Sequence, residues 1–123
     1  MRYYTEQHEW VEHADGTATL GITGYAANEL GDITFVELPE VGDSFEKGSV
    51  LCVIESVKAA SDVYAPVNGE VAEVNSELED QPELINSSAE EKGWLCKLKG
   101  VDPSMVEGLM SAEAYKSFTG SGE

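Results

Sequence analysis

The chain has 123 residues, of which 41% are hydrophobic, and its 24 acidic and 7 basic residues give a formal net charge of −17. This length supports one hydrophobic core, so we expect a single domain over residues 1–123, with a core at about 3–100, a C-terminal helical segment at about 102–118 and a tail at 119–123. A uniformly acidic surface repels phosphate, no apolar run approaches the roughly 20 residues of a membrane span, and no signal or transit peptide begins the chain, so we expect no nucleic-acid partner and no membrane association. The expected location is the cytoplasm of a bacterium, with a processed organellar protein as the alternative.

The first predicted elements are two strands joined as a hairpin. Residues 9–13 and 17–22 flank an Asp-Gly pair at 15–16, which is a strong hairpin signal. In the second strand Ala18, Leu20 and Ile22 share one face, which we predict to be inward.

A short helix is predicted next, over residues 24–30. Thr23 supplies an N-terminal cap and Gly31 a C-terminal stop. The following run, 33–38, is apolar at most positions, which predicts a strand buried on both faces and closed by Pro39.

The second hairpin surrounds a lysine. Strand-like runs at 49–54 and 62–65 flank Lys58, and the second run ends in turn formers at Pro66 and Gly69. Lys58 is therefore expected at or near a hairpin tip, where a flexible amine suits amide attachment of a carboxylic-acid cofactor. A solvated turn lysine is the alternative interpretation.

The rest of the chain adds two strands and a helical C-terminus. Residues 70–75 predict a strand with Val71 on one face and Ala72 and Val74 on the other, and a polar loop follows through Leu78 and Gln81-Pro82. Residues 94–99 predict a strand with Trp94, Cys96 and Leu98 on its buried face. Beyond Asp102 the apolar residues recur at helical spacing, which predicts one or two helices. The fold class is mainly β, a small antiparallel sandwich or flattened barrel.

Several conspicuous residues receive structural interpretations. Cys52 and Cys96 lie in apolar strands and are expected to be buried free thiols. Two histidines without further nitrogen or sulfur ligands nearby argue against a zinc site, and no metal is expected. The remaining assignments are core positions for Trp10 and Trp94 and positive φ angles at Gly42, Gly48 and Gly69. No phosphate-binding loop or catalytic motif is present, so we expect a non-enzyme.

Eight sequence blocks, taken in order, resemble the glycine cleavage system H proteins, a family of lipoyl carriers. They are His8-Glu9-Trp10-Val11, Gly21-Ile22-Thr23, Leu30-Gly31-Asp32, Phe35-Val36-Glu37-Leu38-Pro39 with Val41-Gly42, Glu55 to Asp62 around Lys58, Ala65-Pro66-Val67-Asn68-Gly69-Glu70-Val71, Pro82-Glu83-Leu84-Ile85-Asn86 and Gly93-Trp94. The resemblance covers nearly the whole chain and implies the hammerhead sandwich of lipoyl and biotinyl carriers. Biotin carriers flank their lysine with methionines, whereas Val57 and Ala59 stand here.

The resemblance implies a shuttle with lipoate covalently attached to Lys58. Its arm would take the aminomethyl group from the pyridoxal-phosphate glycine decarboxylase (P protein) to the tetrahydrofolate-dependent aminomethyltransferase (T protein). Dihydrolipoyl dehydrogenase (L protein) would reoxidise it, and a lipoate ligase or a lipoyl or octanoyl transferase would attach the cofactor to a monomeric carrier.

The resemblance also implies roles for four other residues. Glu55 and Ala59 flank the lysine and are candidates for recognition by partners. Glu9 and Glu29 are candidates for lining a cleft that shelters the aminomethyl group, although an exposed strand carboxylate is an equal interpretation of Glu9. Gln7 and Glu29 depart from the serine and histidine that family members can carry at these positions. Two other functions stay open: a relay of lipoyl groups to other enzymes, and an unmodified acidic interaction domain.

Overall fold

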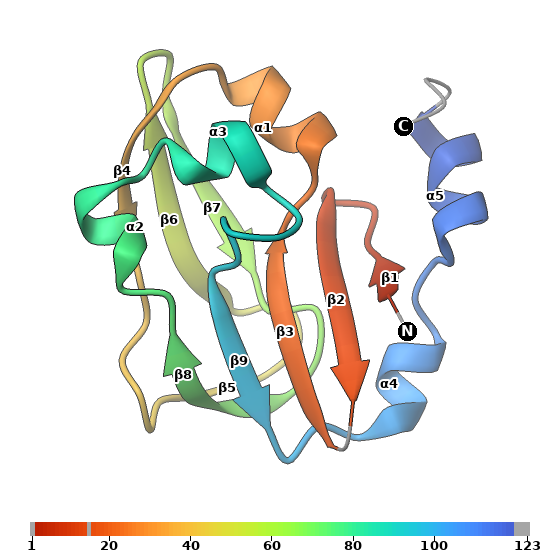
Figure 1. Ribbon diagram of the computed structural model, residues 1–123. Coiled ribbons are helices and arrows are strands. Elements are labelled where there is room, and N and C mark those ends of the chain that lie inside the picture. Colours follow the sequence, from red (N-terminus) through yellow and green to blue (C-terminus); the bar gives the residue numbers. More distant parts are fainter. Residues whose placement is uncertain (1, 15, 120–123) are drawn as a thin grey trace.

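The computed structural model describes residues 2–14 and 16–119, whose strands form two antiparallel sheets (Figure 1). The six-stranded sheet has the order β1-β2-β3-β9-β8-β5 and comprises β1 (Arg2–Tyr4), β2 (Glu9–Ala14), β3 (Thr17–Ile22), β9 (Cys96–Lys99), β8 (Gly69–Val74) and β5 (Ser44–Phe45). The three-stranded sheet has the order β4-β6-β7 and comprises β4 (Ile33–Glu37), β6 (Val50–Ser56) and β7 (Ala60–Tyr64). The predicted mainly β antiparallel sandwich is confirmed.

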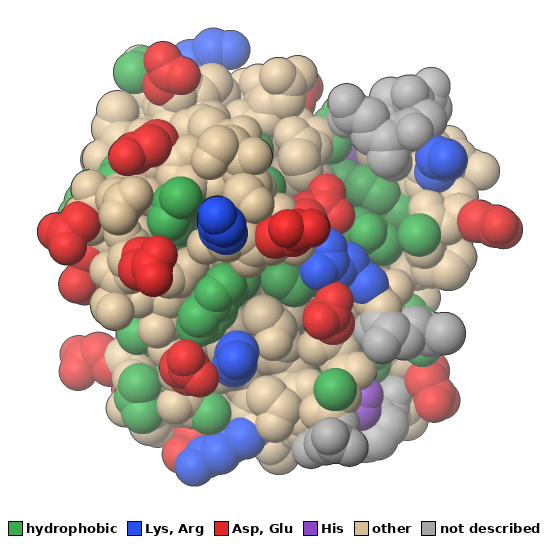
Figure 2. All heavy atoms as spheres, in the orientation of Figure 1, with side chains coloured by type: hydrophobic (Ala, Val, Ile, Leu, Met, Phe, Trp, Pro, Cys, Tyr) green, Lys and Arg blue, Asp and Glu red, His purple; other side chains and the backbone are tan. Residues whose placement is uncertain are grey.

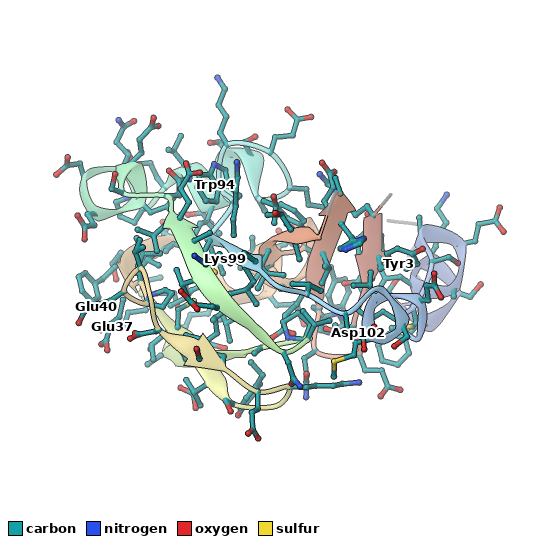
Figure 3. The ribbon with its side chains drawn as sticks, turned by 90° about the horizontal axis from the view of Figure 1, so that it is seen from below. Tyr3, Glu37, Glu40, Trp94, Lys99 and Asp102 are labelled. Atoms are coloured by element: carbon teal, nitrogen blue, oxygen red, sulfur yellow. The ribbon has the colours of Figure 1, made fainter. Side chains whose placement is uncertain are left out.

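Five short helices complete the described part of the chain. They are α1 (Gly24–Leu30), α2 (Glu77–Asp80), α3 (Leu84–Ser88), α4 (Pro103–Glu107) and α5 (Ala112–Thr119). Figure 1 shows α1 and α3 together at the end of the molecule where β6 turns into β7, while α4 and α5 lie beside β1. Asp102 caps the start of α4, its carboxylate accepting a hydrogen bond from the Ser104 N–H at 2.9 Å (Figure 3). Of the predicted tail at 119–123, Thr119 belongs to α5, and residues 120–123 lie outside the described residues.

The helix α1 forms where its capping residues predict it. The Thr23 hydroxyl accepts a hydrogen bond from the Ala26 N–H at 3.2 Å. Gly31 follows at φ 79° and ψ −155°, a backbone conformation essentially reserved for glycine, so the chain leaves the helix there. Both boundaries agree with the prediction from sequence.

The buried apolar side chains form two clusters. One lies beneath β2, β3, β8 and β9 and includes the predicted inward residues Ala18 and Leu20. The other lies under α1, α3 and the β6–β7 hairpin and includes Ile22. Cys52 and Cys96 are buried free thiols, as expected, one in each cluster.

Four predictions about strands and turns were wrong. In β4, Thr34 and Phe35 are exposed, because a register shift between Ile33 and Phe35 leaves only Ile33 and Val36 facing the core.

In β8 a register shift between Val71 and Glu73 breaks the alternation, so Val74 packs against the same cluster as Val71. Trp94 precedes β9 and is only half-buried, with the Lys97 amine 5.3 Å from its ring centre, so Leu95 and not Trp94 enters the core. Gly42 and Gly48 have positive φ as predicted, but Gly69 does not; a Cβ there would lie 2.9 Å from the Leu98 side chain.

The polar loop expected around Leu78 and Gln81-Pro82 contains α2, and α3 follows directly after it. Leu78 and Ile85, one on each helix, are fully buried in the cluster under α1, α3 and the β6–β7 hairpin. Each helix spans about one turn and buries a single side chain, so the sequence shows no helical periodicity there. Within the described residues, no helix combines the length and apolar character needed to cross a bilayer.

Candidate functional site

The β6–β7 hairpin carries Lys58 at its tip. β6 ends at Ser56 and β7 begins at Ala60, and Glu55 pairs with Ala60 across the hairpin. Lys58 and Ala59 are exposed, and Lys58 is the only basic residue from 49 to 65. Its amine is therefore accessible, as predicted from the two flanking strands.

Ser56 gives the tip a defined shape. Its hydroxyl accepts hydrogen bonds from the Lys58 N–H at 3.1 Å and the Ala59 N–H at 3.2 Å, and donates to the Ala59 carbonyl at 3.1 Å. The Ser56 N–H also donates to that carbonyl, at 2.9 Å. Sequence reasoning missed this residue, although a serine two positions before the lysine is a recognisable turn-forming signal.

Beside the hairpin lies a cleft of about 280 Å³ formed by the N-terminal turn, α1 and β7. It brings together Glu9 and Glu29, the two candidates suggested by the resemblance, and adds Asp62. Its described lining contains no lysine or arginine; the residues are Gln7, His8, Glu9, Ile22, Tyr25, Ala26, Glu29, Leu30, Ile54, Ser61, Asp62 and Val63. The cleft is therefore an acidic recess with apolar walls.

Glu9 is buried, with 3% of its surface exposed, so the alternative of an exposed strand carboxylate is wrong. One carboxylate oxygen accepts a hydrogen bond from the Tyr64 N–H at 2.7 Å, and the other accepts from the Thr5 hydroxyl at 3.2 Å. Burial raises its pKa to about 7, and these two hydrogen bonds oppose the rise. The two hydrogen bonds thus hold the carboxyl in place, and its pKa lies near neutral pH.

His8 lies beside Glu9 in an unusual backbone conformation. Its φ of 65° is positive, and its ring Nδ1 lies 2.7 Å from the Tyr115 hydroxyl of α5. Burial lowers the pKa of His8, while the Glu29 carboxylate acts in the opposite direction. His8 is therefore mostly neutral at pH 7 and adds little positive charge to the cleft.

Lys58 extends from the hairpin toward the end of α1. A Cβ placed on Gly31 would lie 3.4 Å from Lys58 Cε and 3.9 Å from Lys58 Nζ, so the lysine stem passes over this glycine. Gly31 directly follows Leu30, which lines the acidic cleft. Ser61, Asp62 and Val63 of β7 line the cleft, so Lys58 stands on the hairpin that borders the cleft and does not itself line it.

Glu55 lies apart from the cleft carboxylates. It is exposed on β6, between Phe35 of β4 and Ala60 of β7, on the outer face of the three-stranded sheet. Glu37, the last residue of β4, and Glu40 lie at the outer edge of the molecule, on the side away from Tyr3 (Figure 3). The structure therefore separates the flanking residues Glu55 and Ala59 from the cleft residues Glu9 and Glu29.

Comparison with known proteins gives a consistent result. The family model described as "Glycine cleavage H-protein" matches residues 2–121. A glycine cleavage system H protein of Alteromonas mediterranea is 56% identical over 115 residues, covering 93% of this chain and 89% of that protein. A glycine cleavage system H protein of Thermotoga maritima is 50% identical over 118 residues, covering 96% of this chain and 95% of that protein. The crystal structure of a Mycobacterium marinum glycine cleavage system H protein superposes with a TM-score of 0.87 at 37% identity, covering 97% of this chain and 96% of that one.

Proposed function

Because the chain belongs to the glycine cleavage H-protein family, a carrier component of the glycine cleavage system, we propose that it bears lipoate in amide linkage to Lys58. The observation that carries the proposal is the position of Lys58: an exposed lysine at the tip of the β6–β7 hairpin, whose second strand lines a cleft that contains three carboxylates. When bound, lipoate would supply a disulfide that accepts the aminomethyl group of glycine. The residues of the chain fit this group, because both an attachment point and an adjacent recess are present.

The cleft residues would bind and protect an ammonium group. Glu29 and Asp62 supply negative charge at its edge, and Glu9 supplies an ionisable carboxyl at its base. A cation entering the cleft would favour the ionised form of Glu9 and so lower its pKa from about 7. The side chains of Ile22, Leu30 and Ile54 would reduce access of water to the bound group.

The remaining surface would serve the partners. We propose glycine decarboxylase, the aminomethyltransferase and dihydrolipoyl dehydrogenase as successive partners of a monomeric, cytoplasmic carrier, with a lipoate ligase or a lipoyl or octanoyl transferase modifying Lys58. Glu55 and Ala59, exposed beside the lysine, are the proposed recognition contacts. A net charge of −17 would accelerate encounters with partners whose active-site entrances are basic.

The decisive experiment is an intact-mass spectrum of the protein from its native cells, with peptide mapping, for wild type, Lys58→Arg and Lys47→Arg. We expect one lipoyl adduct on Lys58 in the wild type and in Lys47→Arg, which alters an exposed lysine on another turn. Lys58→Arg should fold normally and carry no adduct. Modification removes one positive charge, from −17 to −18, so a native gel should also separate the two forms.

An unmodified wild-type chain in cells with active lipoylation would contradict the proposal. Loss of folding in Lys58→Arg would show that the lysine is structural. An adduct without recovery of the decarboxylase in a pulldown would favour a lipoyl relay over a role in glycine cleavage.

A further inference from the structure

We propose that Asn86, on α3, is a positioning residue for the Lys58 tip. The inference rests on the proposed attachment of lipoate to Lys58 and concerns how the body of the protein holds that lysine for modification. Asn86 is far from Lys58 in sequence and belongs to a different element, so neither the hairpin motif nor the cleft assigns it a role.

The side-chain amide of Asn86 bridges both sides of the loop that follows α1. Its Nδ2 donates to the Gly31 carbonyl at 2.8 Å, and its Oδ1 accepts from the Ile33 N–H at 2.9 Å. The two bonds thus hold the residues immediately before and after Asp32. Asn86 therefore fixes the backbone of a loop that has no regular secondary structure at 31–32.

The same loop holds the hairpin tip. The Asp32 carbonyl accepts a hydrogen bond from the Val57 N–H at 3.0 Å. Val57 directly precedes Lys58 and is 66% exposed, so this backbone contact, and not side-chain burial, connects Val57 to the protein body. Gly31, one residue earlier in the loop, lies beneath the Lys58 stem.

Two sets of hydrogen bonds thus act on the tip in different ways. Ser56 sets the internal shape of the turn, through its bonds to Lys58 and Ala59. The path from Asn86 through the Gly31–Ile33 loop to Val57 sets the direction of that turn relative to α1 and the cleft. A modifying enzyme that must align the lysine amine depends on both, because misplacement of a reacting group by about 1 Å can cost 100-fold in rate.

Asn86 suits an experimental test because it is exposed, whereas its neighbour Ile85 is fully buried. Asn86→Ala removes both loop hydrogen bonds and leaves the core unchanged. Ser87→Ala, at the exposed neighbouring position on α3, is the matched control. Asn86→Asp retains an acceptor for the Ile33 N–H, loses the donor to Gly31 and should give an intermediate result.

Two measurements on the purified unmodified protein test the proposal. The first is the hydrogen-exchange rate of the Val57 N–H, compared with that of an interior β6 amide. The second is kcat/KM for modification of Lys58 by a purified lipoate ligase with lipoate and ATP, followed by intact mass. We expect Asn86→Ala to exchange the Val57 proton about fivefold faster and to lower kcat/KM by about threefold or more, while Ser87→Ala and the interior amide stay at wild-type values.

Unchanged exchange at Val57 in Asn86→Ala would overturn the proposal, as would faster exchange with a wild-type modification rate. Equally fast Val57 exchange and an equally low kcat/KM in Ser87→Ala would also overturn it, since they would indicate a general disturbance of α3. If the ligase fails to modify the wild type, the proposed function fails for that enzyme, and the exchange measurement still decides whether Asn86 anchors the tip.

Discussion

Glu9 shows how burial can change the behaviour of a single carboxyl group. Its pKa of about 7 lies above the ordinary value of 4.5, so the folded state binds its proton more tightly than the unfolded state. The resulting contribution to stability is fully present below about pH 4.5 and is lost as the pH rises through about 7. For the full shift it amounts to about 3 kcal/mol.

Glu9→Gln should therefore be compared with wild type by urea unfolding between pH 5 and 8. We expect the free energy of unfolding of the wild type to fall relative to that of Glu9→Gln as the pH rises, because the variant has no proton to lose. For the control Glu6→Gln, at a neighbouring exposed position, the free energy of unfolding should change with pH in parallel with that of the wild type. Parallel curves for wild type and Glu9→Gln would mean that Glu9 titrates normally.

At the residue scale, sequence reasoning could identify Lys58 but not the environment of the cleft residues. The lysine lies between two strand patterns, so its place at a tip follows from local signals. The burial of Glu9 depends on Tyr64, 55 residues away, whose N–H binds its carboxylate. Asp62 reaches the cleft only because the hairpin packs beside α1, which no pattern within the hairpin shows.

At the scale of elements, α5 illustrates a helix held by a few specific contacts. The Tyr115 hydroxyl lies 2.7 Å from His8 Nδ1 and 2.8 Å from the Thr23 hydroxyl, and its ring stacks on Tyr4 with centroids 4.8 Å apart. Thr23 is also the N-terminal cap of α1. One side chain thus connects the C-terminal helix to α1 and to the turn before β2.

Tyr115→Phe should retain the stacking and lose both hydroxyl contacts. We expect a loss of about 1–2 kcal/mol in the free energy of unfolding, because polar groups of His8 and Thr23 lose a partner. The measurement is urea unfolding, with limited proteolysis of α5 as a local readout. Lys116→Gln, exposed on the same helix, is the control, and equal stability of Tyr115→Phe and wild type would contradict the assigned role.

Sequence patterns predicted the elements whose signals are local. The β2–β3 hairpin, the capped helix α1 and the hairpin around Lys58 each have a turn or capping residue at their boundaries. The register shifts in β4 and β8 and the single-turn helices α2 and α3 depend on packing between distant segments. The alternation of apolar and polar residues along the sequence contains no signal for these features.

At the scale of the whole molecule, charge repulsion is the dominant electrostatic feature. Figure 2 shows acidic side chains spread over the visible face, with basic side chains scattered among them. Four ion pairs among the described residues use only Arg2, Lys97 and Lys99. Most carboxylates in the described part of the chain lie outside these ion pairs and repel one another.

Added salt should stabilise the protein. Raising NaCl from about 10 mM to about 500 mM shortens the Debye length from roughly 30 Å to under 10 Å and screens this repulsion. We expect a higher melting temperature at neutral pH in the higher salt, with KCl giving the same result as NaCl. A lower melting temperature would mean that the four ion pairs contribute more than the repulsion.

The burial of Cys52 and Cys96 has a consequence for redox chemistry. Burial raises the pKa of Cys96 to about 12 and that of Cys52 well above 9. Only the thiolate attacks a disulfide, and at pH 7 a buried thiol with so high a pKa is almost entirely protonated. A disulfide borne on Lys58 would therefore not exchange with thiols of its own carrier, so the protein is chemically inert toward the oxidised form of its proposed cargo arm.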